Sequence, residues 1–195
     1  MTEQPSQTIT RADAADRERH AYRLRPAVES DLRAITDIYN AAVGAGGSSA
    51  DLTPRTVEQR RAWVESHKPP YAVFVLTVDD GADDGDAAAA AGRVVGFGAL
   101  SVFYDRAGYD GVTDLAYYVA PDWRGKGAGT ALLDGLLGEC RARGMRKACA
   151  IIFADNAGSI ALMHRFGFTR FGLMPRAATD STGTMRDMSY WHLDL

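Results

Sequence analysis

Residues 117–130 read Tyr-Tyr-Val-Ala-Pro-Asp-Trp-Arg-Gly-Lys-Gly-Ala-Gly-Thr, and this segment constrains the fold most strongly. The residues before it, from Val112 to Val119, are the mix of β-branched, aromatic and aliphatic side chains that suits a buried strand. The residues after it repeat apolar side chains at the spacing of an amphipathic helix, at Leu132, Leu133, Leu136, Leu137 and Cys140. The stretch therefore predicts a strand, a glycine turn and the first turn of a helix.

Glycines alternate with other residues in this turn, and two cations flank them. The first N–H groups of a helix have no intrahelical partner and lie at the positive end of its dipole, so they attract anions. Glycine lets an anion come down onto this backbone, and the expected guest is a phosphate or pyrophosphate. The predicted cradle consists of Arg124, Gly125, Lys126, Gly127, Ala128, Gly129 and Thr130.

Other glycine-rich phosphate loops do not fit these residues. A P-loop needs Ser or Thr directly after its Gly-Lys, but Gly127 follows Lys126. A Rossmann fingerprint needs its third glycine where Thr130 stands, and an acid after a second strand that the sequence lacks. A plain tight turn would account for one or two of the glycines, but not easily for three between two cations.

Composition places the chain among globular proteins. It has 195 residues, a hydrophobic fraction of 46% and a net charge of −3, which suit one sizeable core and give no basic stripe for nucleic acid. No apolar run approaches the roughly 20 residues that span a bilayer, and the start is polar, so we expect no membrane association and a cytoplasmic location. Cys140 and Cys149 are read as small core residues.

The rest of the chain predicts an ordered domain over 21–195 after a disordered tail over 1–20. The chain has helix signals before Leu32 and from Thr53-Pro54 to Ser66, where proline would lie in the first turn, and again after Asn156 up to Gly167. Residues 79–92 are read as a hairpin insertion and 175–183 as a polar loop. The further strands are predicted at 22–26, 71–78, 93–103, 146–153, 169–172 and 184–195.

The glycine turn resembles the Arg/Gln-x-x-Gly-x-Gly/Ala loop of the GNAT superfamily of N-acetyltransferases. Residues 155–159 and Phe166-Gly167-Phe168 resemble that family's later motif, and the likeness spans about Arg23 to Leu195. Tyr109-Asp110 and the segments 173–177 and 185–191 are similar to the phosphinothricin and methionine sulfoximine acetyltransferase branch.

The resemblance implies a single α/β domain whose mixed, mostly antiparallel sheet has helices on both faces. It implies acetyl-CoA as the acyl donor, no metal, a homodimer, and an acceptor that is a small amine with an α-carboxylate. The pyrophosphate would lie on residues 124–130, while the backbone around Tyr118 and Val119 binds the thioester arm and polarises its carbonyl. Asn156, with Ser159, would bind the pantetheine arm, although a plain helix cap would have the same sequence.

The resemblance also assigns the acid–base chemistry. Asp114 stands where the branch keeps a glutamate resembling a general base, and an alkylammonium of pKa ~10 needs such a proton acceptor. Asp is one methylene shorter than Glu, and a carboxylate paired with backbone or arginine is the alternative. Met163 occupies the place where relatives carry a Tyr or His acid. His164 is the candidate replacement, although it is rotated ~100° around the helix. A thiol of pKa ~8.5 can also leave without a dedicated acid.

Acceptor recognition is assigned to residues outside the glycine turn. Arg106 could hold a carboxylate with two parallel hydrogen bonds, or be an ordinary solvated arginine. Tyr109, Tyr117 and Arg176 are further candidates, and the glycine- and serine-rich loop 44–51 either shapes the acceptor site or only connects. Three alternatives for the function stay open: another amine or antibiotic as acceptor, a protein lysine or N-terminus, and a non-catalytic acyl-CoA-binding regulatory module.

Overall fold

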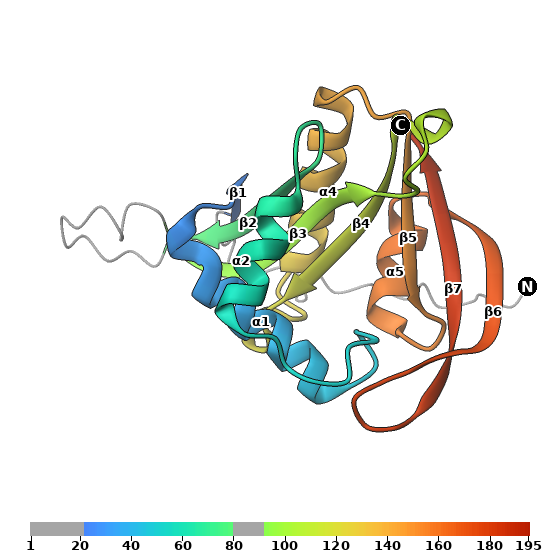
Figure 1. Cartoon of the computed structure of the whole chain (residues 1–195), viewed down its shortest axis with the longest axis horizontal. Coiled ribbons are helices and arrows are strands. Elements are labelled where there is room, and N and C mark those ends of the chain that lie inside the picture. Colours follow the sequence, from blue (N-terminus) through green and yellow to red (C-terminus); the bar gives the residue numbers. More distant parts are fainter. Residues whose placement is uncertain (1–21, 80–91) are drawn as a thin grey trace, which may run out of the picture.

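The computed structural model describes residues 22–79 and 92–195, which form a seven-stranded sheet in the order β1-β2-β3-β4-β5-β7-β6 (Figure 1). The strands are β1 (Tyr22–Pro26), β2 (Ala72–Val78), β3 (Arg93–Val102), β4 (Val112–Val119), β5 (Lys147–Phe153), β6 (Thr169–Thr179) and β7 (Met185–Asp194). The helices are α1 (Leu32–Ala45), α2 (Val57–Ser66), α4 (Ala128–Ala142) and α5 (Ala157–Arg165), with short 3-10 turns η2 (Glu29–Asp31), η3 (Ala107–Tyr109) and η4 (Pro121–Trp123). The expected tail over 1–20 and most of the expected insertion lie outside the described residues.

One strand pair decides the shape of the sheet. All pairings in the described sheet are antiparallel except β4 with β5, which confirms the mixed, mostly antiparallel architecture. These two strands pair only at Val112 with Lys147, Thr113 with Ala148 and Asp114 with Cys149. Beyond Asp114 the strands diverge, so the sheet is split on the carboxyl-terminal side of this residue (Figure 1).

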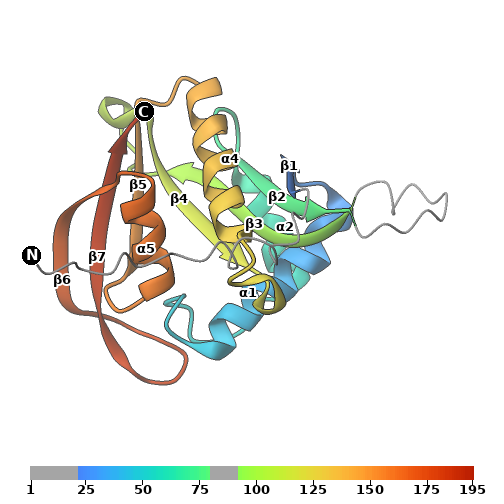
Figure 2. The same cartoon turned by 180° about the vertical axis from the view of Figure 1, so that it is seen from behind.

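Helices α4 and α5 cover one face of the sheet (Figure 2). The leucine stripe of α4 is buried as predicted, with Leu132, Leu133 and Leu136 fully inaccessible to solvent. A Cβ at Gly98 of β3 would lie 2.5 Å from Leu136 Cδ1 and 2.9 Å from the Ala116 carbonyl, so only glycine allows this close approach. The close contact brings α4 down onto β3 and β4.

Helices α1 and α2 cover the opposite face, where Ile35 and Val43 of α1 pack on Phe97 and Ala99 of β3. The strand β4 contributes to both layers because its side chains alternate. Leu115 packs toward α4 and Tyr118 toward α1, which places Asp114 on the α1 side of the sheet.

Two boundaries predicted from the sequence were wrong. Helix α2 begins at Val57 rather than at Thr53-Pro54, because Thr56 and Gln59 form a capping box that defines the first turn there. Strand β6 continues to Thr179 through the segment predicted as a loop from Pro175. A bulge between Met174 and Ala178 accommodates the proline, and pairing with β7 then resumes.

Candidate active site

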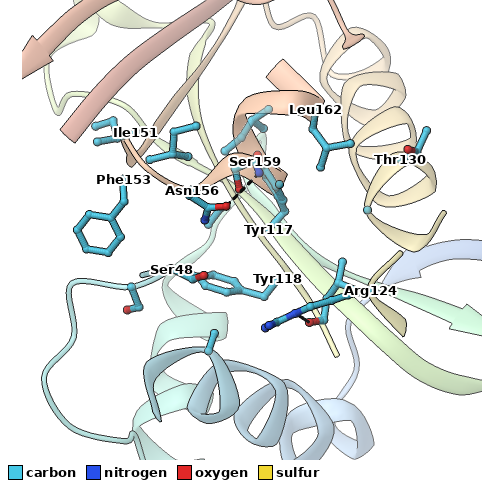
Figure 3. Close-up of a pocket in the computed structure, with 18 of the residues that line it drawn as sticks. Ser48, Tyr117, Tyr118, Arg124, Thr130, Ile151, Phe153, Asn156, Ser159 and Leu162 are labelled. Carbon is cyan, nitrogen blue, oxygen red and sulfur yellow. Dashed lines mark hydrogen bonds between the residues drawn. The ribbon is translucent and has the colours of Figure 1, made fainter. Parts of the chain in front are cut away.

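A cavity of about 880 Å³ opens where β4 and β5 separate. Its walls come from β4, the glycine turn, the first turns of α4 and α5, the edge of β5 and the loop after α1 (Figure 3). The glycine turn is thus brought together with Asp114, Asn156 and residues 48–50, which are far apart in sequence.

The glycine turn has the backbone geometry that the predicted anion cradle requires. Gly127 is the N-cap of α4 with φ +89°, Gly125 has φ +75°, and no side chain in 22–79 or 92–195 caps this helix. The first intrahelical bond runs from Ala131 N to Gly127 O at 3.0 Å, so the N–H groups before it have no intrahelical partner. A Cβ at either glycine would meet nothing within 4 Å, so an oxyanion has open access to this backbone. Ala128 itself is buried and can contribute only its backbone.

Three cations line the cavity near this helix terminus. Arg124 lies with Nε 3.4 Å from the Val119 carbonyl, and Lys126 Nζ lies 5.2 Å from the centre of the Trp123 ring. The third, Arg165 of α5, was not predicted. The positive charge of the described lining is therefore supplied by the glycine turn before α4 and by the last residue of α5.

The opened edge of β4 presents backbone groups to the cavity. The carbonyls of Ala116 and Tyr118 lie against Gly98 and Gly96 of β3, where they would be 2.9 and 3.0 Å from an added Cβ. Because backbone groups alternate in direction along a strand, those of Tyr117 and Val119 face the split instead. The Val119 N–H therefore points into the split, as the predicted thioester site requires, whereas the backbone of Tyr118 is engaged with β3.

Asp114 is the carboxylate at the inner end of the cavity. Its Oδ1 is buried and has no hydrogen-bond partner among the described residues. Burial raises the pKa of this carboxyl to about 7, since desolvation penalises the charged form. A carboxyl with these features can accept a proton near neutral pH, and the role of Asp114 as the base stays a prediction.

The two tyrosines of β4 point to opposite faces. The Tyr118 ring stacks on Phe97 with centroids 5.2 Å apart and meets Tyr39 edge-on at 5.1 Å. The Tyr117 hydroxyl is buried and has no partner in hydrogen-bond geometry within the described chain. Burial raises its pKa, and the nearby Ser159 side chain partly offsets that rise. Tyr117 thus lines the cavity as a neutral phenol.

Asn156 adopts the helix-cap arrangement that the sequence left open. Its Oδ1 accepts from Ser159 N at 3.0 Å (Figure 3), and its Nδ2 donates to Gly47 O at 3.3 Å. Asn156 and Ser159 both line the cavity, so a ligand there would contact a carboxamide that already fixes the start of α5.

Besides Ala128, four predicted site residues are not among the described residues that line the cavity. His164 is exposed and packs edge-on against Trp191 at 5.2 Å, while Met163 beside it is fully buried. Arg106 lies over the Tyr104 ring at 5.5 Å, and Tyr109 is 43% exposed. Arg176 is exposed, with φ +50° in the β6 bulge. Their proposed roles stay predictions without support from the cavity geometry.

The structure adds a wall that sequence reasoning left undecided. Ser48, Ser49 and Ala50 line the cavity, and Ser49 Oγ lies 3.0 Å from the Tyr39 hydroxyl. The loop after α1 is therefore part of the site and more than a connector. The sequence did not predict the apolar part of the cavity wall on β5 and its neighbours, because no sequence pattern shows which strand residues will face a cavity. This apolar group comprises Ile151, Ile152, Phe153, Leu162 and Met188.

The described residues contain neither a metal-binding cluster nor a membrane-spanning helix. Within 22–79 and 92–195, no group of three or more His, Cys, Asp or Glu side chains is arranged to hold a metal ion. In the same part of the chain, none of the helices combines the length and apolarity needed to cross a membrane.

Comparison with known proteins gives consistent relatives. Residues 33–168 match the model of the family described as "Acetyltransferase (GNAT) family". A methionine sulfoximine/methionine sulfone acetyltransferase of Pseudomonas paraeruginosa is 33% identical over 173 residues, covering 88% of this chain and 94% of that protein. A phosphinothricin N-acetyltransferase of Streptomyces coelicolor is 32% identical, covering 76% and 82%. The crystal structure of a phosphinothricin acetyltransferase from Sinorhizobium meliloti in complex with acetyl-CoA has a TM-score of 0.76 and 32% identity, covering 89% of this chain and 88% of that one.

Proposed function

The chain belongs to the GNAT family of acetyltransferases, and we propose that it moves the acetyl group of acetyl-CoA to the primary amine of a small amino acid or analogue. The observation that carries the proposal is the pairing of two features in one cavity. A glycine helix terminus that no described side chain caps suits a pyrophosphate, and a carboxyl whose buried Oδ1 has no partner among the described residues suits a proton acceptor. The relatives named for methionine sulfoximine and phosphinothricin support an amino-acid-like acceptor.

The residues of the cradle fit acetyl-CoA. The backbone of 125–130 would hold the pyrophosphate, with Arg124, Lys126 and Arg165 supplying positive charge. The bound cosubstrate supplies an activated thioester to the site. Val119 N–H, facing the split, would donate to the thioester oxygen and so favour attack on its carbonyl carbon.

Asp114 would remove the proton that the amine must lose. An alkylammonium of pKa ~10 is charged at neutral pH and cannot act as a nucleophile. A carboxylate whose pKa is about 7 is ionised just above neutrality and still basic enough to accept a proton, directly or through one water. We assign no dedicated acid to the departing thiolate, because Met163 has no proton to donate and His164 lies outside the cavity lining.

A homodimer in the cytoplasm is also part of this proposal. Strand β6 is the edge of the described sheet, and Phe171, Leu173 and Met174 on it are each about half exposed, at 55%, 49% and 51%. Such a run of apolar side chains suits a subunit contact. Light scattering coupled to size exclusion would test the dimer, and a monomer at micromolar concentration would contradict it.

The activity is tested by following coenzyme A release with a thiol reagent. The panel contains phosphinothricin, methionine sulfoximine, methionine sulfone and ordinary amino acids, beside polyamines, aminoglycosides and lysine peptides. We expect turnover with the amino-acid group. Turnover confined to peptides or aminoglycosides would contradict the acceptor class. Acetyl-CoA binding without any turnover would favour the regulatory-module alternative.

A further inference from the structure

One buried carboxylate, that of Asp180, collects hydrogen bonds from three parts of the chain. Its side chain is fully buried in the turn between β6 and β7. Within that turn Oδ1 accepts from Thr182 N at 2.9 Å, Thr182 Oγ1 at 2.5 Å and Thr184 N at 3.1 Å. Oδ2 accepts from Arg186 Nε at 2.6 Å. These bonds hold the pKa of Asp180 well below its usual range. Among them, the bond from the Thr182 side chain lowers the pKa most, followed by the bond from Arg186.

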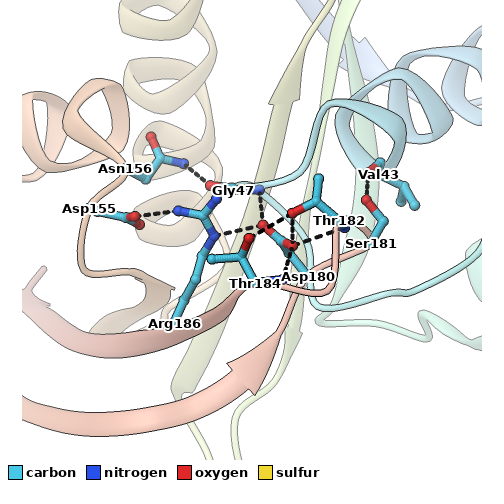
Figure 4. A network of polar contacts seen from close by, with 9 residues as sticks. All are labelled: Val43, Gly47, Asp155, Asn156, Asp180, Ser181, Thr182, Thr184 and Arg186. Atoms are coloured by element: carbon cyan, nitrogen blue, oxygen red, sulfur yellow. Dashed lines mark hydrogen bonds and ion pairs between the residues drawn. The ribbon is translucent and has the colours of Figure 1, made fainter.

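Arg186 connects this turn to the corner between β5 and α5. Its Nε donates to Asp180 and its Nη1 donates to Asp155 Oδ2, so one guanidinium bridges two carboxylates (Figure 4). The side chain is only 21% exposed. The fork geometry matters here, because a lysine ammonium is a point charge and cannot span both partners in the same way.

The loop after α1 is held by the same group. Gly47 N donates to Asp180 Oδ2 at 3.2 Å, and Gly47 O accepts from Asn156 Nδ2 at 3.3 Å. Ser181 Oγ donates to the carbonyl of Val43, at the end of α1 (Figure 4). A Cβ at Gly46 would lie 2.9 Å from Thr182 Cγ2, so the loop packs directly on the turn. We call Asp180, Arg186, Asp155 and Gly47 the Asp180 clamp.

The clamp crosses the split in the sheet. Gly47 belongs to the half that holds α1 and β4, whereas the other three members belong to the half that holds β5, β6 and β7. The residues just after Gly47, Ser48 to Ala50, line the cavity. They follow α1, which packs on the face of β4 toward which Asp114 points, while the anion cradle belongs to α4 on the other face.

We propose that the Asp180 clamp is a positioning device for the acceptor, which holds the Ser48–Ala50 wall on the Asp114 side of the cavity and limits the size of amine that fits. This inference rests on the proposed function. It assigns specificity to residues that contact each other and the loop, without a contact to the reacting atoms. Its signature is an effect on the acceptor that leaves acetyl-CoA binding unchanged.

The test compares Arg186→Gln with the wild type, using the same acceptor panel graded by side-chain size. We expect acceptor KM to rise on the order of tenfold, because small displacements of a positioning wall are costly. Discrimination between small and bulky amines should narrow, while kcat and the acetyl-CoA Kd stay within about twofold. Arg186→Lys should rescue only part of the KM, since charge alone does not bridge two carboxylates. Arg33→Gln is the matched control, because it removes another arginine–aspartate pair, exposed on α1 and remote from the cavity lining.

A second readout needs no acceptor. Amide hydrogen exchange in segment 44–51 should speed up in Arg186→Gln and stay unchanged in α4. Asp155→Asn keeps the buried Asp180 pair and should give a smaller change in the same segment, and it carries the test if Arg186→Gln does not fold. Unchanged exchange in 44–51, or equal losses in acceptor and acetyl-CoA binding, would overturn the clamp. If the wild type turned over none of the acceptors, the proposed function would be contradicted. The hydrogen-exchange data would still test the clamp independently.

Discussion

Asp114 of β4 and Cys149 of β5 are the last paired residues of the parallel strand pair in the described sheet. The carboxyl therefore lies at the inner end of the split, and burial there raises its pKa to about 7. The neighbouring thiol lies in the same buried environment. Burial, and then the charge of Asp114, raises the pKa of Cys149 to about 11, so the thiol stays neutral and uncharged beside the carboxylate.

Removing the charge of Asp114 should separate catalysis from binding. We expect Asp114→Asn to lower kcat by about 100-fold or more, because the amide cannot take the ammonium proton. Acetyl-CoA affinity, measured by calorimetry, should be unchanged. Asp114→Glu is the matched control and should keep most of the rate, since it retains a carboxylate with a longer reach. An Asn variant as fast as wild type across the pH range would remove the base assignment.

The pH dependence should report the same group. Since only the ionised carboxylate accepts a proton, kcat/KM should fall below a midpoint near the pKa of about 7, and this step should be absent in Asp114→Asn. The free energy of unfolding should depend on pH in the opposite sense. The folded-state pKa of Asp114 lies above the unfolded value, so its contribution is present at low pH and is lost as pH rises through about 7. The difference in Tm, Asn variant minus wild type, should thus be larger at about pH 8 than at about pH 4. An equal difference at both values would argue against a raised pKa.

The glycine cradle can be tested on two positions of one helix. Gly127→Ala forces a side chain into positive φ and places a methyl group where the anion should lie, so acetyl-CoA Kd should rise at least tenfold, about 1.4 kcal/mol. Gly138→Ala, at an exposed site of α4 with nothing within 4 Å, should leave the Kd unchanged. It should raise stability by about 0.5–1 kcal/mol, as alanine favours a helix interior. Equal affinities in the two variants would place the pyrophosphate elsewhere.

The contact of Gly98 with α4 should be costly to disturb. In Gly98→Ala the new methyl group meets Leu136 Cδ1 and the backbone carbonyl of Ala116, and the carbonyl cannot move without the strand. We expect a loss of about 1–3 kcal/mol from overpacking, seen as a lower Tm by thermal denaturation. Gly108→Ala, where nothing lies within 4 Å, is the control. A stable Gly98 variant would mean that α4 can shift away from the sheet.

His164 should be dispensable for the reaction. It is exposed, packs on Trp191 and lies outside the cavity lining, so His164→Ala should keep kcat within about twofold and lose only a fraction of a kcal/mol of stability. A 100-fold loss of kcat with acetyl-CoA bound normally would restore the histidine as the acid and imply that α5 rotates during turnover.

Local sequence determined the elements and one half of the site. The spacing of hydrophobic residues and the positions of helix-ending residues predicted β4, α4 and the ends of α5. Both signals act over only a few residues of the chain. The same short-range physics predicted the anion cradle, a single turn of backbone between Arg124 and Thr130. The resemblance to a family added Asp114, which lines the same cavity because the eight-residue strand β4 leads from it toward the glycine turn.

The residues that lie opposite the predicted cradle could be identified only from the tertiary structure. The split after Asp114, the loop Ser48–Ala50 and the β5 edge become one cavity through strand pairings and hydrogen bonds between residues more than a hundred positions apart, such as Gly47 with Asp180. It also placed Arg106, Tyr109, His164 and Arg176 outside that cavity lining. Sequence patterns encode the periodicity of a segment but not its distance from another segment, and the acceptor side of this site is made of such distances.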